Sequence, residues 1–583
     1  MQLTEAEIIY QGGPIYTGVP SQPLAHALAV KEGLLLAVGD MDLVKEYRGQ
    51  KTKVIDLLGN TIIPGIVDAH LHPMWGAKLF NSFSLKNEPL RVPELLDRLR
   101  DFLKASPQKD GWLKVCGWSR VDGPQITFFD LDQVSKERPI ILFSSDCHFV
   151  AVNSRGLALL NLSPQSPQPR DGKFGLDQNG RLTGVFEDGP AMRLYDYVTD
   201  LSVDFGINLL KRAQWALNRE GVTTILDARA RAETLNPVKL LEKRRELTLR
   251  YFGAPEITPE ECPSPELAEK AIFRVQDFFR EFSEDNFLKP VPSVVLRHLK
   301  VFLDGMPTTL TAYSEIPFYE KEDNGAWQLG KFQAQPRFSL STITALFQRA
   351  VMQNIIPHAH VIADGAAALG ISALREARKK FPNQNIRGAL AHLDIVTPKQ
   401  YREMAEIGAI AVLSFQWGGV TEKRYQEIQN LYGPERTQGF ETHGKFFDAG
   451  VTVAYGSDWP VDPLAEWRNF QIGLTRQIPE SKTSITPTKN HPRLDNDRNL
   501  TLAEVLQAAT INGAVSLGAL KWIGTLERGK FADFAVISGN LFQASPQDIG
   551  STRVLQTLVG GKLVYDYRVD FAETLNVART FLE

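Results

Sequence analysis

Residues 59–74 read GNTIIPGIVDAHLHPM, and the organisation of the whole chain can be worked out from this stretch. Its apolar, β-branched residues and Pro-Gly turn predict an extended segment that ends near the histidines. Side chains two residues apart in a strand point the same way, so His70 and His72 share a face, with Asp68 below them. Two imidazoles from one strand end can form half of a zinc site. Taken alone, the pair is better explained as two surface histidines, so other segments must supply further ligands.

Polar residues recur where later strand-like runs end. Parallel β/α patterning predicts that these ends meet on one face, where active sites of such proteins lie. Each residue has an ordinary explanation alone: a core histidine, a lysine extended along apolar surface, or a turn-capping aspartate. Their recurrence at successive strand ends favours a shared site instead, built from His70, His72, Lys300, His360, His392 and Asp458.

Composition excludes several classes of protein. The 583 residues carry 65 Lys+Arg against 68 Asp+Glu, a formal net charge of -3, which argues against a nucleic-acid or anionic-membrane partner. No apolar run reaches transmembrane length, and the N-terminus has no signal-peptide pattern. The three cysteines lack metal or disulfide spacing, which indicates a reducing, cytoplasmic compartment.

Three sequence regions are distinguishable. Residues 1–62 and 523–583 both contain short strands with tight turns, and we expect these two ends to pair into one small β domain. Residues 63–522 alternate strands with amphipathic helices, for example at 366–379 and 398–407, which predicts a parallel β/α domain. Residues from about 76 to 205 break this alternation, so we interpret them as a lid-like insertion after the first strand.

The combined motifs resemble the amidohydrolase superfamily, specifically its amidohydrolase-3 branch of N-substituted formamide deformylase-like proteins. The resemblance covers nearly the full length, through PGIVDAHLH, SSDCHFVAVNSRGL, GVTTILDA, LKVFLDG, HAHVIAD, GSDWPVDPL, LAEVLQAATING and GTLERGKFADFAVI. It implies an α/β fold: a distorted TIM (β/α)8 barrel with a small β-sandwich built from both chain termini.

The resemblance also implies a metal centre. His70, His72, His360 and His392 match the family's histidine ligands, and Asp458 matches an aspartate that binds metal and moves protons. Lys300 matches a lysine that is carboxylated in several members and bridges two metals. One or two Zn2+ ions suit this ligand set, and Fe, Mn or Co is also compatible with it.

Two segments depart from the family pattern, and a third carries the family's acidic residue. Ala363 stands where glycine is usual, so the loop after His360 has less conformational freedom. Residues 306–309 read Met-Pro-Thr-Thr where a Ser/Gly-rich stretch is usual, and Asp188 matches the family's acidic position. We expect these changes to alter substrate fit and to leave metal binding intact.

The sequence therefore predicts a metal-dependent amidohydrolase that cleaves a non-peptide C–N bond, of amide or formamide type, in a small molecule. Metal-activated water attacks the carbonyl, and Asp458 accepts its proton and delivers it to the leaving amine. His392 acts as a ligand or an oxyanion stabiliser. Substrate contacts are predicted, against the competing explanations of structural hydrogen bonding or packing, for Asp146, His148, Asp188, Trp417 and Trp459.

Three alternatives stay open. A cyclic amide hydrolase or an N-acyl amino acid deacylase would use the same fold and ligands. An inactive regulatory or scaffold relative would be expected to lose ligands, and every expected ligand type is present here. A homodimer is expected only because dimers are common among soluble enzymes.

Overall fold

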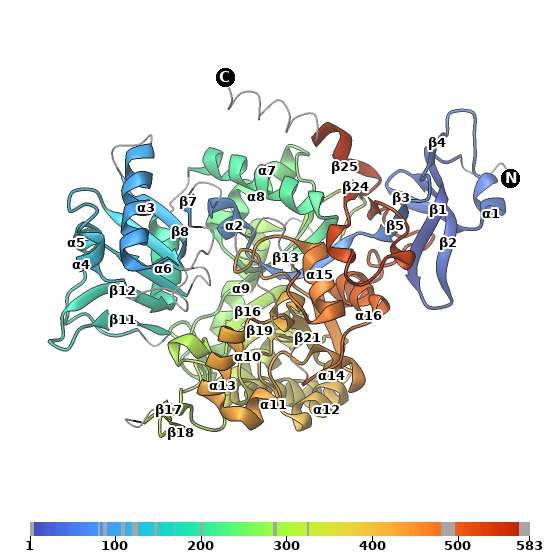
Figure 1. The fold of residues 1–583 in the computed structure, drawn as a ribbon. Coiled ribbons are helices and arrows are strands. Elements are labelled where there is room, and N and C mark those ends of the chain that lie inside the picture. Colours follow the sequence, from blue (N-terminus) through green and yellow to red (C-terminus); the bar gives the residue numbers. More distant parts are fainter. Residues whose placement is uncertain are drawn as a thin grey trace.

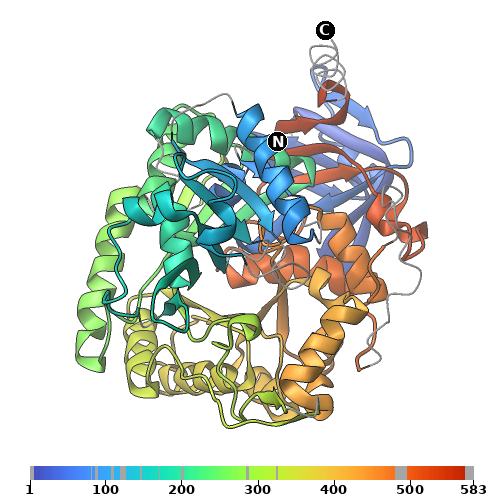
Figure 2. The same cartoon turned by 60° about the vertical axis from the view of Figure 1, so that its left-hand side comes forward.

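The computed structural model describes residues 5–79, 82–85, 90–106, 111–118, 126–144, 148–169, 171–198, 202–283, 288–322, 326–479 and 496–570. Figure 1 shows three regions: a sheet containing both chain ends, a central set of parallel strands and helices, and a lobe on the left built from residues that follow the first parallel strand. Figure 2 shows the same regions from another side.

The two ends of the chain lie in one sheet. Its order is β25-β24-β23-β5-β1-β2-β3, and β4 pairs with β1. The ends meet where β5 pairs antiparallel with β23. The ladder forms a single eight-stranded sheet, so the predicted two-layer sandwich is not confirmed. The strands are β1 (Ile8–Val19), β2 (Gln22–Lys31), β3 (Leu34–Gly39), β4 (Lys53–Asp56), β5 (Thr61–Pro64), β23 (Phe534–Ile537), β24 (Val554–Val559) and β25 (Lys562–Asp566).

The parallel strands form two sheets, β15-β14-β13-β6 and β16-β19-β20-β21-β22. They are almost wholly buried, as expected of parallel strands covered on both faces. Among the described residues the ladder does not close into a ring, so the predicted closed barrel is not confirmed. The strands are β6 (Ile66–Leu71), β13 (Val222–Ala230), β14 (Arg250–Pro255), β15 (Val294–Leu296), β16 (His298–Phe302), β19 (Ile356–Val361), β20 (Ala389–His392), β21 (Ile410–Leu413) and β22 (Thr452–Tyr455).

Helices alternate with these strands along the chain. In α12, Pro398 occupies the first turn, Thr397 and Gln400 form a capping box, and Gly408 ends the helix with φ 63°. None of the helices in the described ranges qualifies as a membrane span by length and hydropathy. The main helices are α2 (Pro73–Leu79), α7 (Val203–Arg219), α8 (Ala232–Lys243), α9 (Ala268–Phe282), α10 (Leu340–Met352), α11 (Asp364–Lys380), α12 (Pro398–Ile407), α13 (Glu422–Thr437), α14 (His443–Asp448), α15 (Glu466–Thr475) and α16 (Leu502–Gln507).

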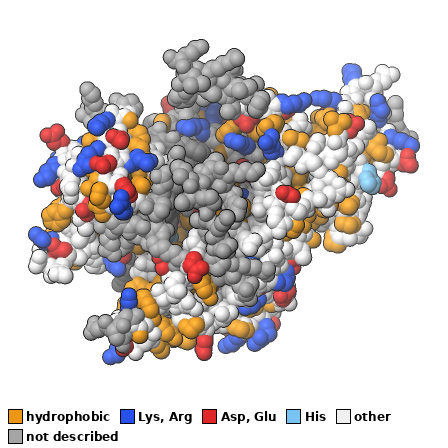
Figure 3. All heavy atoms as spheres, in the orientation of Figure 1, with side chains coloured by type: hydrophobic (Ala, Val, Ile, Leu, Met, Phe, Trp, Pro, Cys, Tyr) orange, Lys and Arg blue, Asp and Glu red, His pale blue; other side chains and the backbone are white. Residues whose placement is uncertain are grey.

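The inserted segment has a sheet of its own, in the order β11-β12-β10-β9-β8-β7. It also has its own buried clusters, one of which contains Leu99, Val115 and Phe149. On the face in Figure 3, positive and negative side chains are intermixed over this lobe. Its elements include β7 (Phe83–Ser84), α3 (Val92–Ala105), β8 (Leu113–Trp118), α4 (Phe128–Leu131), β9 (Ile140–Ser144), β10 (Phe149–Val152), α5 (Ser154–Leu159), β11 (Gly172–Leu176), β12 (Leu182–Asp188) and α6 (Gly189–Val198).

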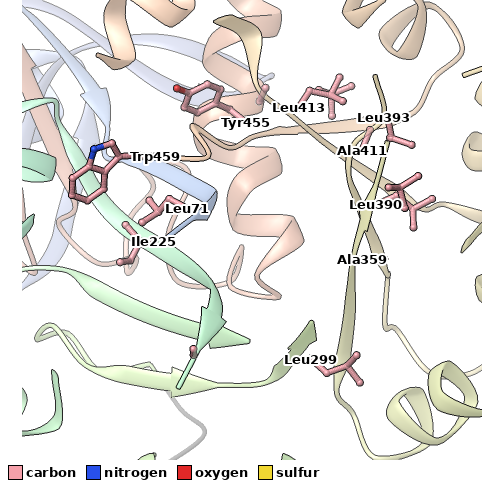
Figure 4. Close-up of a cluster of buried hydrophobic side chains, with 14 of the residues drawn as sticks. Leu71, Ile225, Leu299, Ala359, Leu390, Leu393, Ala411, Leu413, Tyr455 and Trp459 are labelled. Atoms are coloured by element: carbon pink, nitrogen blue, oxygen red, sulfur yellow. The ribbon is translucent and has the colours of Figure 1, made fainter. Parts of the chain in front are cut away.

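A single apolar core joins the two parallel sheets. Leu71 of β6 and Ile225 of β13 belong to the same cluster as Leu299, Leu390 and Tyr455 from the other sheet (Figure 4). Because the core is shared, the carboxyl ends of both sheets are held at fixed positions relative to one another.

Candidate metal centre

One small cavity collects the predicted metal ligands. It has a volume of about 30 Å3, room for about one water molecule, and its wall includes all six residues: His70, His72, Lys300, His360, His392 and Asp458. Each of the six side chains is at most 7% exposed. The six residues predicted from the sequence therefore lie together, although they span almost 400 positions of the chain.

The histidines of the first strand face Asp458. The Nε2 atoms of His70 and His72 lie 3.5 Å and 3.4 Å from Asp458 Oδ1. Gly456 permits this approach, because a Cβ there would lie 2.7 Å from the Cβ of His70. Asp68 joins the two segments, since it accepts hydrogen bonds from the backbone N–H of His70 (3.2 Å) and from the N–H (3.0 Å) and hydroxyl (2.5 Å) of Ser457.

The electrostatics of the cavity suit metal ligands. Burial lowers the pKa of His392 to about 3 and that of His70 well below its ordinary value. Burial alone would raise the pKa of Asp458, but the neighbouring His72, His392 and Lys300 hold it below its usual value. The imidazoles of His70 and His392 are thus neutral and the carboxylate is charged, which are the protonation states that ligate a cation.

Lys300 lies at the centre of this cluster. Its Nζ is 3.4 Å from His70 Nε2 and 4.6 Å from the ring centroid of Phe302. Burial lowers the pKa of the amine to about 7. A substantial fraction of Lys300 is therefore unprotonated near neutral pH, and only this form has a lone pair.

The donor spacing fits a bound cation. Donor atoms of His70, His392 and Asp458 all lie within 4.8 Å of one another. Ligands about 2.0–2.2 Å from a tetrahedral ion lie about 3.3–3.6 Å apart. The distances from Asp458 Oδ1 to the Nε2 atoms of His70 (3.5 Å) and His72 (3.4 Å) are close to this value. Among the described residues, His360 Nε2 and Asp458 Oδ1 are buried without a hydrogen-bond partner. Such orphaned acceptors are costly unless another group satisfies them, so the residues present fit a metal ion.

Two of these residues have unusual backbone conformations. His392 has φ 79° and Asp458 has φ 54°. Non-glycine residues rarely adopt this region, and strained residues cluster at functional sites. Sequence patterns do not predict these left-handed conformations, since neither residue is a glycine or asparagine.

His358 is a site residue to which sequence reasoning gave no role. Its Nε2 lies 2.8 Å from His70 Nδ1, and its side chain is buried. A histidine that binds metal through Nε2 carries its proton on Nδ1, so His358 is the hydrogen-bond acceptor that fixes this tautomer. The available signal was the HAH spacing, which places His358 and His360 on one strand face.

The loop after His360 does not need the glycine that the family resemblance implies. Ala363 is the N-cap of α11 with φ -105° and ψ 168°, an extended conformation open to any residue. Asp304 holds this loop, because its carboxylate accepts hydrogen bonds from the N–H groups of Ile362 (3.0 Å) and Ala363 (3.1 Å). It also accepts one from Tyr313 (3.1 Å). The departure at Ala363 therefore leaves the loop conformation unstrained.

The predicted substrate-contact residues have different positions. His148 lines the cavity, and its Nδ1 is 2.7 Å from Asp188 Oδ1, while Asp146 lies outside the described residues. Trp417 also lines the cavity and stacks on His392 with ring centroids 5.4 Å apart. Trp459 belongs to the apolar core and is not part of the cavity wall defined by the described residues.

A second cavity of about 270 Å3 adjoins the first, with His72 and Trp75 lining both. Its wall carries charges of both signs, including Lys78, Asp196 and Arg229. Arg229 is ion-paired with Asp196 (3.4 Å) and with Glu256 (2.8 Å). This space is large enough for the part of a small molecule that the first cavity cannot hold.

Comparison with known proteins gives consistent relatives. Residues 53–565 match the Amidohydrolase family. The putative amidohydrolase YtcJ of Bacillus subtilis is 24% identical, over 96% of this chain and 99% of that protein. N-substituted formamide deformylase of Arthrobacter pascens is 25% identical, over 93% of this chain and 95% of that protein. A solved structure of a metal-dependent hydrolase from Pyrococcus horikoshii shares the fold with TM-score 0.66 at 18% identity, covering 96% of this chain and 100% of that one.

Proposed function

This chain belongs to the amidohydrolase family, and we propose that it is a metal-dependent hydrolase of a non-peptide C–N bond, of amide or formamide type, in a small molecule. The observation that carries the proposal is the convergence of six predicted ligands on one buried cavity, with donor spacings that fit a cation. The name of the deformylase relative supports a formamide-type substrate. A cyclic amide or an N-acyl amino acid is the alternative substrate class.

Four histidines and Asp458 would hold the ion, with Zn2+ the best match to nitrogen and oxygen ligands. A cation there supplies Lewis acidity toward water and toward a carbonyl oxygen. Asp458 takes the proton of the attacking water, because it is a buried, charged carboxylate. As the alternative to binding the ion, His392 would stabilise the oxyanion, and Trp417 stacked against it forms an apolar wall.

Lys300 is proposed to be carboxylated. Burial that lowers the pKa of its amine to about 7 supports this, because only the neutral amine can attack CO2. A carbamate offers two oxygens to two cations, whereas an ammonium group has no lone pair. With one ion bound, Lys300 would instead lie beside the site, with its Nζ 3.4 Å from His70 Nε2.

We also infer that the two parallel sheets are halves of a distorted barrel. Residues 294–302 pair with β14 in their first half and with β19 in their second, which links the sheets at one side. At the other side, Asp458 N–H donates to His70 O (2.8 Å) and His72 N–H donates to Trp459 O (2.8 Å). These bonds support a ring that is nearly complete where the metal ligands lie.

The test is metal analysis combined with Asp458→Asn. We expect purified protein to contain stoichiometric transition metal and to release amine from a panel of N-substituted formamides and simple amides. Asp458→Asn is expected to lower kcat by about 10²–10⁴-fold, the usual worth of a general base. Normal turnover in a metal-loaded Asp458→Asn variant would remove Asp458 from the role of base. Protein that binds no metal after expression with added zinc would favour the regulatory or scaffold alternative.

A further inference from the structure

A buried hydrogen-bonded chain beside the metal centre has no role in the chemistry proposed so far. His148 Nδ1 lies 2.7 Å from Asp188 Oδ1, and the hydroxyl of Thr311 donates to Asp188 Oδ2 at 2.9 Å. Asp188 is fully buried, and His148 and Thr309, which lies beside Thr311, are 7% and 4% exposed. The chain therefore runs from the loop after β16 through the carboxylate to an imidazole in the cavity wall.

The backbone also fixes the two central residues. The N–H of Asp188 donates to the carbonyl of His148 at 2.8 Å, so the side chains and the main chains of this pair are both joined. Asp188 has φ 55°, a conformation that a non-glycine residue rarely adopts outside functional sites. Burial alone would raise the pKa of Asp188, but the hydrogen bond and charge of His148 hold it below its usual value. A charged carboxylate held in this way keeps a proton on His148 Nδ1 and directs Nε2 away from itself.

His148 and Asp458 approach the cavity beside different ligands. Asp458 lies among His70, His72 and His392, at 3.4–3.8 Å. The ring of His148 lies 6.4 Å from that of His360, centroid to centroid, so it adjoins the ligands without contacting the donor cluster around Asp458. The two proton carriers are thus separate, so one can act on the attacking water and the other on the leaving group.

We propose that His148 is a catalytic residue that donates its Nε2 proton to the leaving nitrogen, with Asp188 and Thr311 as positioning residues. The inference rests on the proposed hydrolase function and divides its two proton transfers between two residues. The carbonyl carbon gains a bond to the water oxygen, and Asp458 takes the water proton. As the C–N bond breaks, its electron pair stays on nitrogen, which takes the His148 proton. Solvent then restores the proton on His148 and removes the one on Asp458, so water and amide become acid and amine.

The inserted segment gains a specific role from this assignment. His148 precedes β10 and Asp188 ends β12, which are adjacent strands of the inserted sheet. Thr311 lies two residues after the segment 306–309 that departs from the family pattern. The leaving group would therefore be recognised by the insertion and by this loop, while the parallel strands bind the carbonyl.

The chain offers a matched control. His443 is also buried and paired with a carboxylate, with Nε2 2.9 Å from Glu441 Oε2, but it is not part of the cavity wall defined by the described residues. His148→Gln thus removes an imidazole–carboxylate pair inside the site, and His443→Gln removes the same kind of pair outside it. Any effect of losing a buried imidazole–carboxylate pair on folding alone should appear in both variants as a similar shift in Tm.

The first experiment measures kcat and KM for ring-substituted formanilides whose anilines differ in basicity, with metal content checked for each variant. For formanilide and 4-methoxyformanilide we expect His148→Gln to lower kcat by about 10²–10⁴-fold. For 4-nitroformanilide, whose electron-poor leaving nitrogen depends less on a proton donor, we expect less than about a tenfold loss. Asp188→Asn should show the same dependence on leaving group with smaller losses, and Thr311→Val a loss of a few-fold. His443→Gln should keep the wild-type pattern.

An equal loss across the panel in His148→Gln, with metal retained, would overturn the assignment while leaving the hydrolase function in place. Wild-type enzyme that is metal-loaded but hydrolyses none of these amides would contradict the proposed function, and this inference with it. If His148→Gln does not fold, Asp188→Asn carries the same comparison.

The second experiment is independent of turnover. In protein labelled with 15N-histidine, the His148 signals should show a protonated Nδ1, both in wild type and in Thr311→Val. A neutral His148 with its proton on Nε2 would exclude the Asp188 hydrogen bond as described and overturn the proposal.

Discussion

Replacing Asp304 should unfold the loop that follows His360 before it affects any other part of the site. The carboxylate is fully buried and accepts three backbone N–H groups, from Ile362 (3.0 Å), Ala363 (3.1 Å) and Tyr313 (3.1 Å). Asp304→Ala strands all three donors in a site that water does not reach. Asp304→Asn keeps one oxygen for two donors and turns an N–H2 group toward the third.

The structure gives the size of the effect. A stranded buried donor costs about 1–3 kcal/mol, so Asp304→Ala should lower the free energy of unfolding by about 3–9 kcal/mol. Asp304→Asn leaves one N–H unsatisfied and should cost about 1–3 kcal/mol. Since Ile362 follows His360 by two residues, metal affinity should fall by about 10–100-fold in the milder variant, as when a ligand loses its outer support.

The assay is urea unfolding followed by tryptophan fluorescence, together with metal competition against a chromophoric chelator. Wild type and both variants are compared, with Asp304→Glu as a size control that keeps the carboxyl group. The reasoning would be refuted if Asp304→Ala were as stable as Asp304→Asn, or if Asp304→Asn bound metal with wild-type affinity despite a measurable loss of stability.

Two further predictions follow from the buried charges and histidines. Burial would raise the pKa of Glu256, but Arg229 and Arg231 lower it to about 2, against about 4.3 when unfolded. This carboxylate therefore adds up to about 3 kcal/mol of stability above pH 4.3, and the contribution is lost as pH falls toward 2. Glu256→Gln should have a lower Tm than wild type at pH 7, with the gap narrowing below pH 4.3; a gap independent of pH would contradict the assignment. His358→Phe removes the acceptor for His70 Nδ1 and should weaken metal binding by about 10–100-fold in competition titrations, whereas unchanged affinity would show that His358 does not fix the tautomer.

Local sequence signals predicted elements whose ends are marked by capping residues. The helix expected at 398–407 has these bounds because Pro398 and Gly408 begin and end it. The helix expected at 366–379 begins two residues earlier, at Asp364, because Ala363 carries no capping side chain. The histidines at strand ends could be predicted in the same way, because the turn residues that follow each strand mark where it ends.

Hydrogen bonds between residues far apart in the chain have no such local signal in the sequence. Asp304 holds a loop almost 60 residues away, and Thr311 contacts Asp188 across 123 positions. Neither pairing follows from spacing or propensity. The first depends on the pairing of β16 with β19, and the second on how the inserted lobe sits against the parallel strands. The ring of strands was likewise implied only by the family resemblance, because the ladder between neighbouring strands depends on their twist and stagger, which periodicity does not determine.

The pairing of the two chain ends has a consequence for synthesis. Strand β5, which leads directly into the strand that carries His70, has β23 as its antiparallel neighbour. Arg250, fully buried, is paired with Asp533, which directly precedes β23. Until residues 534–566 have left the ribosome, the early strand has an open edge and Arg250 has no counter-ion. The strand before His70 therefore gains its β23 neighbour only after almost the whole chain has been synthesised, so its edge would stay open to chaperones for most of translation.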